Sequence, residues 1–333
     1  MATQVSVVIP ARNDAAGLAD AVASSLAQTG VEVVEVLICV GPSSDGTDSV
    51  AQKLSDNHEI VRVVDNPTGG ISDALNLGLA NAQCEVLVRV DARCLLSRDY
   101  AERAVTTMEA TGAANVGAVQ VPVGHTTTQR AIVLAMCHLL GSGGATYRYR
   151  SGDVPRKATS AYLGVFRTSA VRAVGGWDTG FARNEDAELN RRLIEAGHQV
   201  WLDPHLRVDY EPRATLRGLA RQYFDYGWWR RRMVARHRVV QLRQLAAPAI
   251  LLGVTVGIVV AATVSIGFLL IPASYLALLM IAAAFTRGPA TIGERILIIP
   301  ALLTMHLCWG AGFLASLIRG PLTIPVYPAP GSD

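Results

Sequence analysis

Two long stretches without a single charged side chain limit what this chain can fold into. Residues 246–285 form forty positions with no Asp, Glu, Lys or Arg, and residues 296–318 form another twenty-three. A helix needs about 20 apolar residues to cross a bilayer. We therefore predict a membrane anchor at 246–319 with three spans, at 248–266, 267–285 and 296–318. The first two form a tight hairpin, and a short tail follows at 320–333.

The charged residues are concentrated ahead of this anchor. Only five of the 57 lie beyond position 245, and residues 1–212 carry 18 basic against 24 acidic side chains. Residues 213–243 hold nine Arg and one Asp, directly before the first apolar run. Such a block is attracted to anionic headgroups and marks the cytoplasmic side of a membrane protein. We expect a multi-pass protein of the plasma (inner) membrane with its N-terminal domain in the cytoplasm, and we do not expect a nucleic-acid partner.

Composition excludes several other classes of protein. Half of the residues are hydrophobic and 17% are charged, which is incompatible with a disordered chain. The five cysteines are scattered and form no metal-ligand spacing, so neither a disulfide framework nor a structural zinc site is expected.

Residues 1–212 alternate between strand and helix patterns. Buried-strand runs at 5–10, 33–40, 60–64 and 85–90 are separated by helical patterns, of which 47–54 and 72–82 are two. This alternation predicts an α/β domain with a mostly parallel, Rossmann-like sheet. Further along we expect a strand at 161–167, a helix at 184–196 and a short apolar segment at 200–202. Residues 141–150 are either a mobile loop over a site or a surface linker. Ligands bind at the carboxyl ends of parallel strands, so the turns after residues 9, 40 and 90 are the candidate site.

Asp91 follows the buried strand 85–90. A carboxylate at that place can hold a divalent cation that bridges two phosphates. An Asp there is equally suited to cap the helix that follows.

Three carboxylates begin the predicted helix at 184–196: Glu185, Asp186 and Glu188. Acidic residues favour helix N-termini because of the helix dipole, which explains them without any function. The alternative is a general base presented at a cleft, which removes the proton of an attacking hydroxyl.

Residues 222–230 combine five aromatic side chains with arginine, just before the apolar runs. Aromatic faces stack on sugars, and arginine binds phosphate through two parallel hydrogen bonds. An aromatic belt at the membrane surface is the other interpretation, and the two are compatible.

Taken together, these motifs resemble an inverting family 2 glycosyltransferase with a GT-A fold. The similarity covers residues 4–245 and is closest to the membrane-anchored branch that contains succinoglycan-biosynthesis glucosyltransferases. It is carried by the opening run at 5–14, the turn at 41–47, the segments 66–67 and 70–76, the run 175–186, and the region 212–230. Each motif is short, but they occur in family order and at family spacing.

The resemblance implies roles for particular residues. Asp186 corresponds to the catalytic base, with Glu185 beside it, and Asp91 corresponds to the metal ligand for Mg²⁺ or Mn²⁺. The implied donor-binding residues are Pro10, Ala11, Arg12, Asp14, Asp45, Asn76, Asp91 and Arg93. The implied acceptor or phosphate residues near the membrane are Trp177, Gln222, Tyr226, Trp228, Trp229 and Arg230.

Two positions depart from the family pattern. The usual Asp-x-Asp is Asp91-Ala92-Arg93 here, so a cation replaces one acid, and Arg93 is expected to offset diphosphate charge. Gly41 stands where the family has the acid that contacts the base, and Asp45 is the candidate to replace it.

The resemblance therefore implies transfer of a sugar from a nucleotide-diphosphate sugar, expected to be a UDP-sugar, to a lipid-linked (polyprenyl) saccharide in cell-surface or exopolysaccharide assembly. The domains would be a catalytic part at 1–212, an amphipathic interfacial region at 213–245 and the anchor at 246–319. Two alternatives are a transferase that glycosylates polyprenyl phosphate itself and a non-catalytic, membrane-tethered nucleotide-sugar scaffold.

Overall fold

The computed structural model describes residues 2–143 and 153–318, and these residues form two compact units. The first unit contains residues 2–121 and 153–210, and the second contains residues 122–143 and 211–318. The predicted tail at 320–333 and most of the predicted loop at 141–150 lie outside the described residues.

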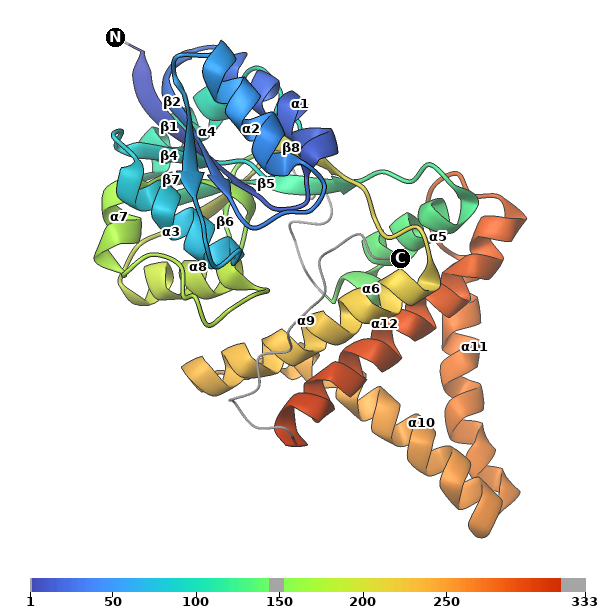
Figure 1. Ribbon diagram of the computed structural model, residues 1–333. Helices are drawn as coiled ribbons and strands as arrows, with labels where there is room; N and C mark the ends of the chain where they lie inside the picture. The colour runs from blue at the N-terminus through green and yellow to red at the C-terminus, as the bar shows by residue number, and fades with distance from the viewer. Residues whose placement is uncertain (1, 144–152, 319–333) are drawn as a thin grey trace. The chain divides into compact units, whose positions relative to one another are not determined.

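The first unit is built on an eight-stranded sheet, drawn in Figure 1. The strands are β1 (Thr3–Ala11), β2 (Val31–Val40), β3 (Val61–Asp65), β4 (Val86–Arg89), β5 (Asn115–Pro122), β6 (Arg156–Lys157), β7 (Tyr162–Arg167) and β8 (Val200–Tyr210). The helices are α1 (Ala15–Leu26), α2 (Thr47–Asn57), α3 (Ile71–Asn81), α4 (Tyr100–Thr111), α7 (Thr168–Ala173) and α8 (Glu185–Glu195).

The strand order is β3-β2-β1-β4-β7-β5-β8-β6. The run β3-β2-β1-β4 is parallel, whereas β7 is antiparallel to both β4 and β5, and β6 is antiparallel to β8. The α/β prediction is confirmed, with an antiparallel half added to the parallel one.

The parallel half forms around apolar runs at the centre of the sheet, such as residues 7–9 of β1 and 36–40 of β2, as strands covered on both faces require. Val7 and Ile9 of β1 are fully buried, together with Leu18 of α1. The antiparallel half was harder to predict. The segment expected at 200–202 is the first part of an 11-residue strand, in which His205, Arg207 and Asp209 alternate with buried residues.

The second unit is helical. It contains α5 (Thr127–Cys137), α6 (Leu139–Ser142), α9 (Leu216–His237), α10 (Ala246–Thr263), α11 (Leu270–Ala284) and α12 (Ile292–Ile318), with short 3₁₀ turns η2 (Leu242–Gln244) and η3 (Ile266–Leu269). Three segments are long and apolar enough to cross a membrane: Leu242–Thr263, Ile266–Ala284 and Ile292–Ile318. They match the three predicted apolar spans to within a few residues.

The predicted hairpin is a close one. A Cβ placed on Gly257 of α10 would lie 3.1 Å from Cβ of Ile271 in α11. The predicted end of the catalytic part, residue 212, lies close to residue 210, where the first unit ends. Residues 122–143 belong to a different part of the molecule than predicted. We expected them with the catalytic part, and they pack with the apolar helices, because Ala131, Ile132 and Met136 give α5 a buried apolar face.

Candidate active site

Turns at the carboxyl ends of three parallel strands lie next to one another in the first unit. Ala11 at the end of β1 pairs with Val40 at the end of β2, and Val8 of β1 pairs with Arg89 of β4. The turns that follow residues 11, 40 and 90 therefore share one edge of the sheet, as the sequence predicted.

Asp45 joins the first two of these turns. Its Oδ2 accepts a hydrogen bond from the Ala15 backbone N–H at 3.0 Å, and its Oδ1 accepts from the Thr47 hydroxyl at 2.6 Å and backbone N–H at 3.1 Å. The Thr47 hydroxyl is the main cause that lowers the pKa of Asp45. The carboxylate predicted to contact the donor thus holds together the N-termini of α1 and α2.

Gly41 occupies a closed space. A Cβ at this position would lie 2.9 Å from Cα of Gly69, and Arg12 reaches the Gly69 carbonyl through Nη1 at 3.3 Å. The acidic side chain that the family has at this position would therefore not fit at Gly41 unless the backbone shifted. Pro10 and Ala11 end β1 beside it, with Ala11 buried.

Arg93 and Asp14 form an ion pair between the first turn and the turn after β4. Arg93 also donates to the Asn13 carbonyl at 2.9 Å. Its guanidinium is 60% exposed, so water screens the pair and leaves it open to exchange for another anion. The sequence predicted both residues at the donor and did not predict that they pair.

The centre of the site is Arg89, the last residue of β4. Its side chain is only 4% exposed and contacts three carboxylates. Nε donates to Asp91 at 3.0 Å, Nη2 donates to Glu185 at 3.2 Å, and Nη1 pairs with Asp186. One arginine thus joins the predicted metal ligand to the predicted base, across 97 residues of chain.

The charges in this cluster are strongly interdependent. Burial opposes the Arg89 charge, but the three carboxylates raise the pKa of its guanidinium well above the ordinary value. Burial raises the pKa of Asp186 above that of an ordinary Asp, although Arg89 counteracts the shift. Burial and the neighbouring Asp186 charge likewise raise the pKa of Glu185. A carboxylate with a raised pKa is a stronger general base.

Trp177 orients Asp186. Its indole Nε1–H donates to Oδ1 of Asp186 at 3.2 Å, and its ring packs edge-on against Phe166 at 5.4 Å. Among the described residues, Oδ2 of Asp186 accepts no hydrogen bond, so it retains its lone pairs. Trp177 is only 1% exposed, so it supports the base from inside the fold and lies away from the surface that an acceptor could reach.

Asn76 secures Trp177 in turn. Its Nδ2 donates to the Trp177 carbonyl at 2.7 Å and its Oδ1 accepts from the Trp177 N–H at 2.8 Å. Asn76, a predicted donor-binding residue, therefore uses both the nitrogen and the oxygen of its side-chain amide to bind the backbone of Trp177.

The remaining predicted residues belong to α9, in the second unit. Gln222 donates to the Tyr226 hydroxyl at 3.0 Å, and Arg230 lies 3.3 Å from the Met233 sulfur. Trp228 and Trp229 are 3% and 0% exposed. Both indole rings are buried, so neither offers an exposed face for stacking on a sugar in this structure. The half-buried Gln222, Tyr226 and Arg230 stay within reach of a ligand.

Asp91 is the expected metal ligand. Within residues 2–143 and 153–318, no group of three His, Cys, Asp or Glu side chains has a metal-binding arrangement. Asp91 is 31% exposed and uses one oxygen for Arg89. One accessible carboxylate fits Mg²⁺ or a similar cation, which needs one or two protein carboxylates when substrate phosphates supply the other ligands.

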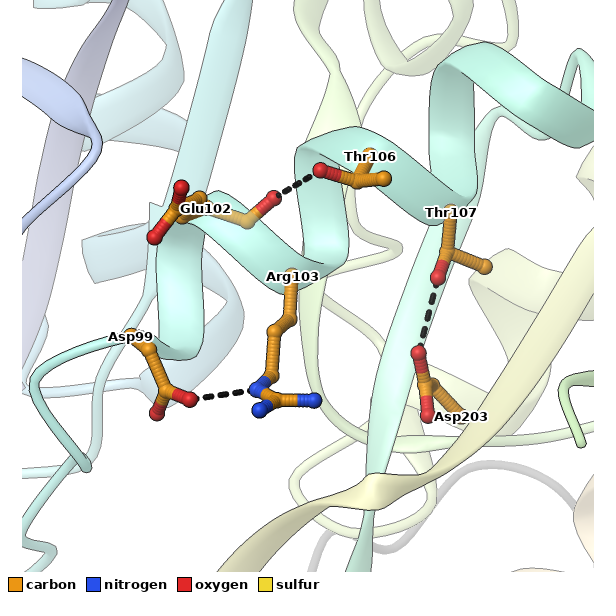
Figure 2. Close-up of a pocket in the computed structure, with 6 residues that line it drawn as sticks. All are labelled: Asp99, Glu102, Arg103, Thr106, Thr107 and Asp203. Carbon is orange, nitrogen blue, oxygen red and sulfur yellow. Dashed lines mark hydrogen bonds and ion pairs between the residues drawn. The ribbon is translucent and has the colours of Figure 1, made fainter. Parts of the chain in front are cut away.

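A separate hollow of about 350 Å³ lies on the surface of the first unit, between α4 and β8. Figure 2 shows two side-chain pairs in its lining: Asp99 with Arg103, and Thr107 with Asp203 at 2.7 Å. It contains none of the predicted site residues.

Two solved structures have folds similar to that of this chain. The mannosyltransferase PcManGT from Pyrobaculum calidifontis, in complex with GDP-Man and Mn²⁺, has a TM-score of 0.60 at 18% identity, over 95% of this chain and 87% of that one. GalNAc-T7 with UDP, GalNAc and Mn²⁺ has a TM-score of 0.51 at 14% identity, over 69% of this chain and 50% of that one. At these identities the likeness shows the fold, which is that of a GT-A glycosyltransferase domain followed by apolar helices.

Sequence comparison narrows the class. The profile of Glycosyl transferase family 2 matches residues 6–174. The succinoglycan biosynthesis protein ExoA of Rhizobium meliloti (strain 1021) is 34% identical over 331 residues, which is 95% of this chain and 96% of the relative. The chain therefore belongs to glycosyltransferase family 2, as the motifs at 5–14 and 175–186 indicated.

Arg89 is the residue that sequence reasoning missed. The signal was present, since a lone arginine interrupts the apolar run Val-Leu-Val-Arg-Val-Asp at 86–91. Residues two apart in an extended segment share a face, so Asp91, just beyond the end of β4, can lie on the same side as Arg89.

Proposed function

We propose that the protein is an inverting glycosyltransferase that moves a sugar from a nucleotide-diphosphate sugar to a lipid-linked saccharide at the cytoplasmic face of the inner membrane. The observation that carries this proposal is the Arg89 cluster, in which one arginine contacts both Asp91, the proposed metal ligand, and Asp186, the proposed base. The full-length similarity to ExoA supports a role in exopolysaccharide assembly.

The donor nucleotide would occupy the strand-end turns around Arg12 and Asp14. Asp91 would hold a divalent cation, Mg²⁺ or Mn²⁺, which neutralises charge on the diphosphate leaving group. The Mn²⁺ in both solved neighbours supports a cation here. Arg93 would lie next to the diphosphate and would exchange Asp14 for phosphate oxygens.

Asp186 would remove the proton from the acceptor hydroxyl as that oxygen attacks the anomeric carbon. The bond to the nucleotide diphosphate breaks on the opposite face, so the anomeric configuration inverts. Arg89 and Trp177 keep Oδ1 of Asp186 fixed, which leaves Oδ2 to take the proton. Holding the base in place lowers the barrier by orientation.

The experiment is a transfer assay on the purified full chain in detergent. UDP- and GDP-sugars are supplied one at a time with a membrane lipid extract, in Mn²⁺, in Mg²⁺ and in chelator. We expect release of the nucleoside diphosphate that requires the lipid extract and stops with chelator. A monosaccharide-phosphate lipid as product would identify polyprenyl phosphate as the acceptor. Donor binding without release, across the whole panel, would indicate the scaffold alternative and overturn the proposal.

A further inference from the structure

Helices α9 and α12 of the second unit touch backbone to backbone. A Cβ placed on Gly227 of α9 would lie 2.0 Å from the Trp309 carbonyl oxygen of α12. Reciprocally, a Cβ on Gly312 of α12 would lie 2.0 Å from the Phe224 carbonyl oxygen of α9. Only glycine permits such an approach. At this crossing the two helices must therefore lie at the same depth relative to any membrane.

The start of α12 and the segment that leads into α9 both contact the first turn of α5. Gln129, in the first turn of α5, donates to the Glu211 carboxylate at 3.0 Å and to the Pro212 carbonyl at 3.3 Å, in the segment that enters α9. The next residue, Arg130, forms an ion pair with Glu294 in the first turn of α12.

From Glu294 to Gly312, α12 advances by about 27 Å at 1.5 Å per residue. Over that length it passes from the beginning of α9 to the middle of α9. The two helices thus run side by side in the same direction, as Figure 1 shows for the yellow α9 and the red α12.

Helix α9 cannot enter hydrocarbon. It carries six arginines in 22 residues: Arg217, Arg221, Arg230, Arg231, Arg232 and Arg236. If α12 crossed the bilayer, α9 would be carried down with it, and Arg221 and Asp225 would approach the bilayer centre. Ionised side chains are strongly disfavoured there. At the interface the same arginines can contact water and anionic headgroups.

Helices α10 and α11 are different. In an apolar stretch of 18 residues from each of these two segments, only 17% is buried inside the protein, against 39% for α12. Their exposed side chains are apolar, such as Val256 and Val259 of α10 and Ile281 of α11. This is the surface that acyl chains would surround.

We propose that α12 is not a third membrane span. It lies in the plane of the membrane interface beside α9, with its exposed Ile296 and Leu317 directed toward lipid, and only the α10–α11 hairpin crosses the bilayer. The chain then leaves α12 on the same side as α9, whereas three spans would leave it on the opposite side. This inference does not depend on the identity of the donor or acceptor.

The test is cysteine labelling of the full chain in sealed membrane vesicles. The background carries Cys137→Ser and Cys308→Ala, while Cys39, Cys84 and Cys94 are buried and stay in place. Single cysteines are then introduced at Val240 after α9, at Ser265 between α10 and η3, and at Ser332 in the tail. A charged maleimide that does not cross membranes is applied to right-side-out and to inverted vesicles. Val240→Cys, which reacts from one side only, establishes that the vesicles are sealed.

We expect Ser332→Cys to react from the same side as Val240→Cys, and Ser265→Cys to react from the other side. Reaction of Ser332→Cys from the Ser265 side would show that α12 crosses the membrane and would overturn the proposal.

A second measurement reports on the depth of α12 itself. Nitroxide labels on Ile296→Cys and Leu317→Cys, about 31 Å apart along the helix, are exposed to a water-soluble paramagnetic relaxant added on the α9 side only. In-plane α12 predicts similar relaxation of both labels. Relaxation of the Ile296 label with full protection of the Leu317 label would contradict it.

Discussion

At the scale of single residues, this site depends on one buried cation. Arg89 is 4% exposed, and its partners Asp91, Glu185 and Asp186 come from two distant parts of the chain. A buried ion pair contributes little net stability, but removing one partner leaves the others uncompensated, at a cost of about 3–5 kcal/mol. Arg89 therefore holds Asp186, the proposed base, in place and counteracts the effect of burial on its pKa.

Replacing Arg89 should change the pH dependence of transfer. Arg89 lowers the pKa of Asp186 against the effect of burial, so Arg89→Gln raises that pKa further. The base must be ionised, so the acidic limb of the pH–rate profile should move to higher pH. Arg89→Lys keeps the charge and should move it less. An unchanged acidic limb in a folded Arg89→Gln protein would remove Arg89 from the titration of the base.

Asp186→Asn tests the base directly. Loss of a general base lowers turnover by roughly 10²–10⁴-fold. Nucleotide binding should remain, because Asn preserves the side-chain oxygen that accepts from Trp177. The readouts are turnover and nucleotide affinity, measured separately. Glu195→Gln, at the exposed end of the same helix, is the matched control and should behave like the wild type. Wild-type turnover in Asp186→Asn would exclude Asp186 as the base.

Among the helices, α8 carries the proposed base Asp186, and a second arginine fixes the first turns of this helix. Arg192 pairs with Glu188, which is completely buried, and donates to the carbonyls of Val174 at 2.6 Å and Gly176 at 2.7 Å. Gly175 and Gly176 adopt φ of +83° and +73°, which glycine tolerates. These contacts of Arg192 fix the turn that leads into Trp177. They therefore position Trp177, which orients Asp186.

Two adjacent arginines of α8 should therefore differ sharply. Arg192→Met leaves Glu188 buried without its partner and should reduce the free energy of unfolding by about 3–5 kcal/mol. Arg191→Met removes an exposed pair with Glu195 and should cost less than about 1 kcal/mol. Thermal unfolding of both variants in the same detergent makes the comparison. Equal losses of stability would mean that the contacts of Arg192 stabilise the fold no more than the exposed ion pair of Arg191 does.

Glycines in two helices allow a similar comparison. Gly227→Ala forces α9 and α12 apart and should reduce the free energy of unfolding by about 1–3 kcal/mol. A Cβ on Gly253 of α10 meets nothing within 4 Å, so Gly253→Ala should leave stability unchanged or raise it slightly. A thermal melt monitored by the exposure of buried cysteines distinguishes the two. Equal melting temperatures would mean that the close approach of the helices is not needed.

At the scale of the whole molecule, a charged α/β unit and an apolar helical unit are joined in one chain. Nearly all of the charge lies in residues 1–245, and the helices α10 and α11 offer apolar side chains to their surroundings. The basic helix α9 has side chains suited to the boundary between water and membrane. It combines arginines that suit headgroups with aromatic side chains that suit the interface.

Membrane extraction tests that division. High salt weakens the attraction between arginines and headgroups but leaves apolar burial intact. The protein should therefore stay in the membrane pellet after washing with high salt and with alkaline carbonate, and detergent alone should release it. A variant lacking charge at Arg231 and Arg232 should pellet equally. Release by salt would show that headgroup attraction, and not the apolar helices, holds the protein.

The sequence by itself determined the properties that local pattern encodes. Apolar run length predicted the segments of α10, α11 and α12, and continuous Val/Ile/Leu runs predicted β1 and β2, because one short stretch of chain is enough to specify each. The family motifs placed Asp91 and Asp186 at strand-end and helix-start positions, which the structure reproduces.

Only the tertiary structure decided which side chains meet. Arg89 reaches Asp186 across 97 residues, Arg93 pairs with Asp14 across 79, and Trp177 holds the base from a buried position. Most of β8 escaped prediction because polar side chains alternate with buried ones along it and lower its local hydrophobicity, whereas β7 lies where the sequence predicted a strand. The contact of α12 with the arginine-rich α9 was also not predicted from the sequence. Apolar composition records that a helix avoids water, but only its neighbours determine whether lipid or protein covers it.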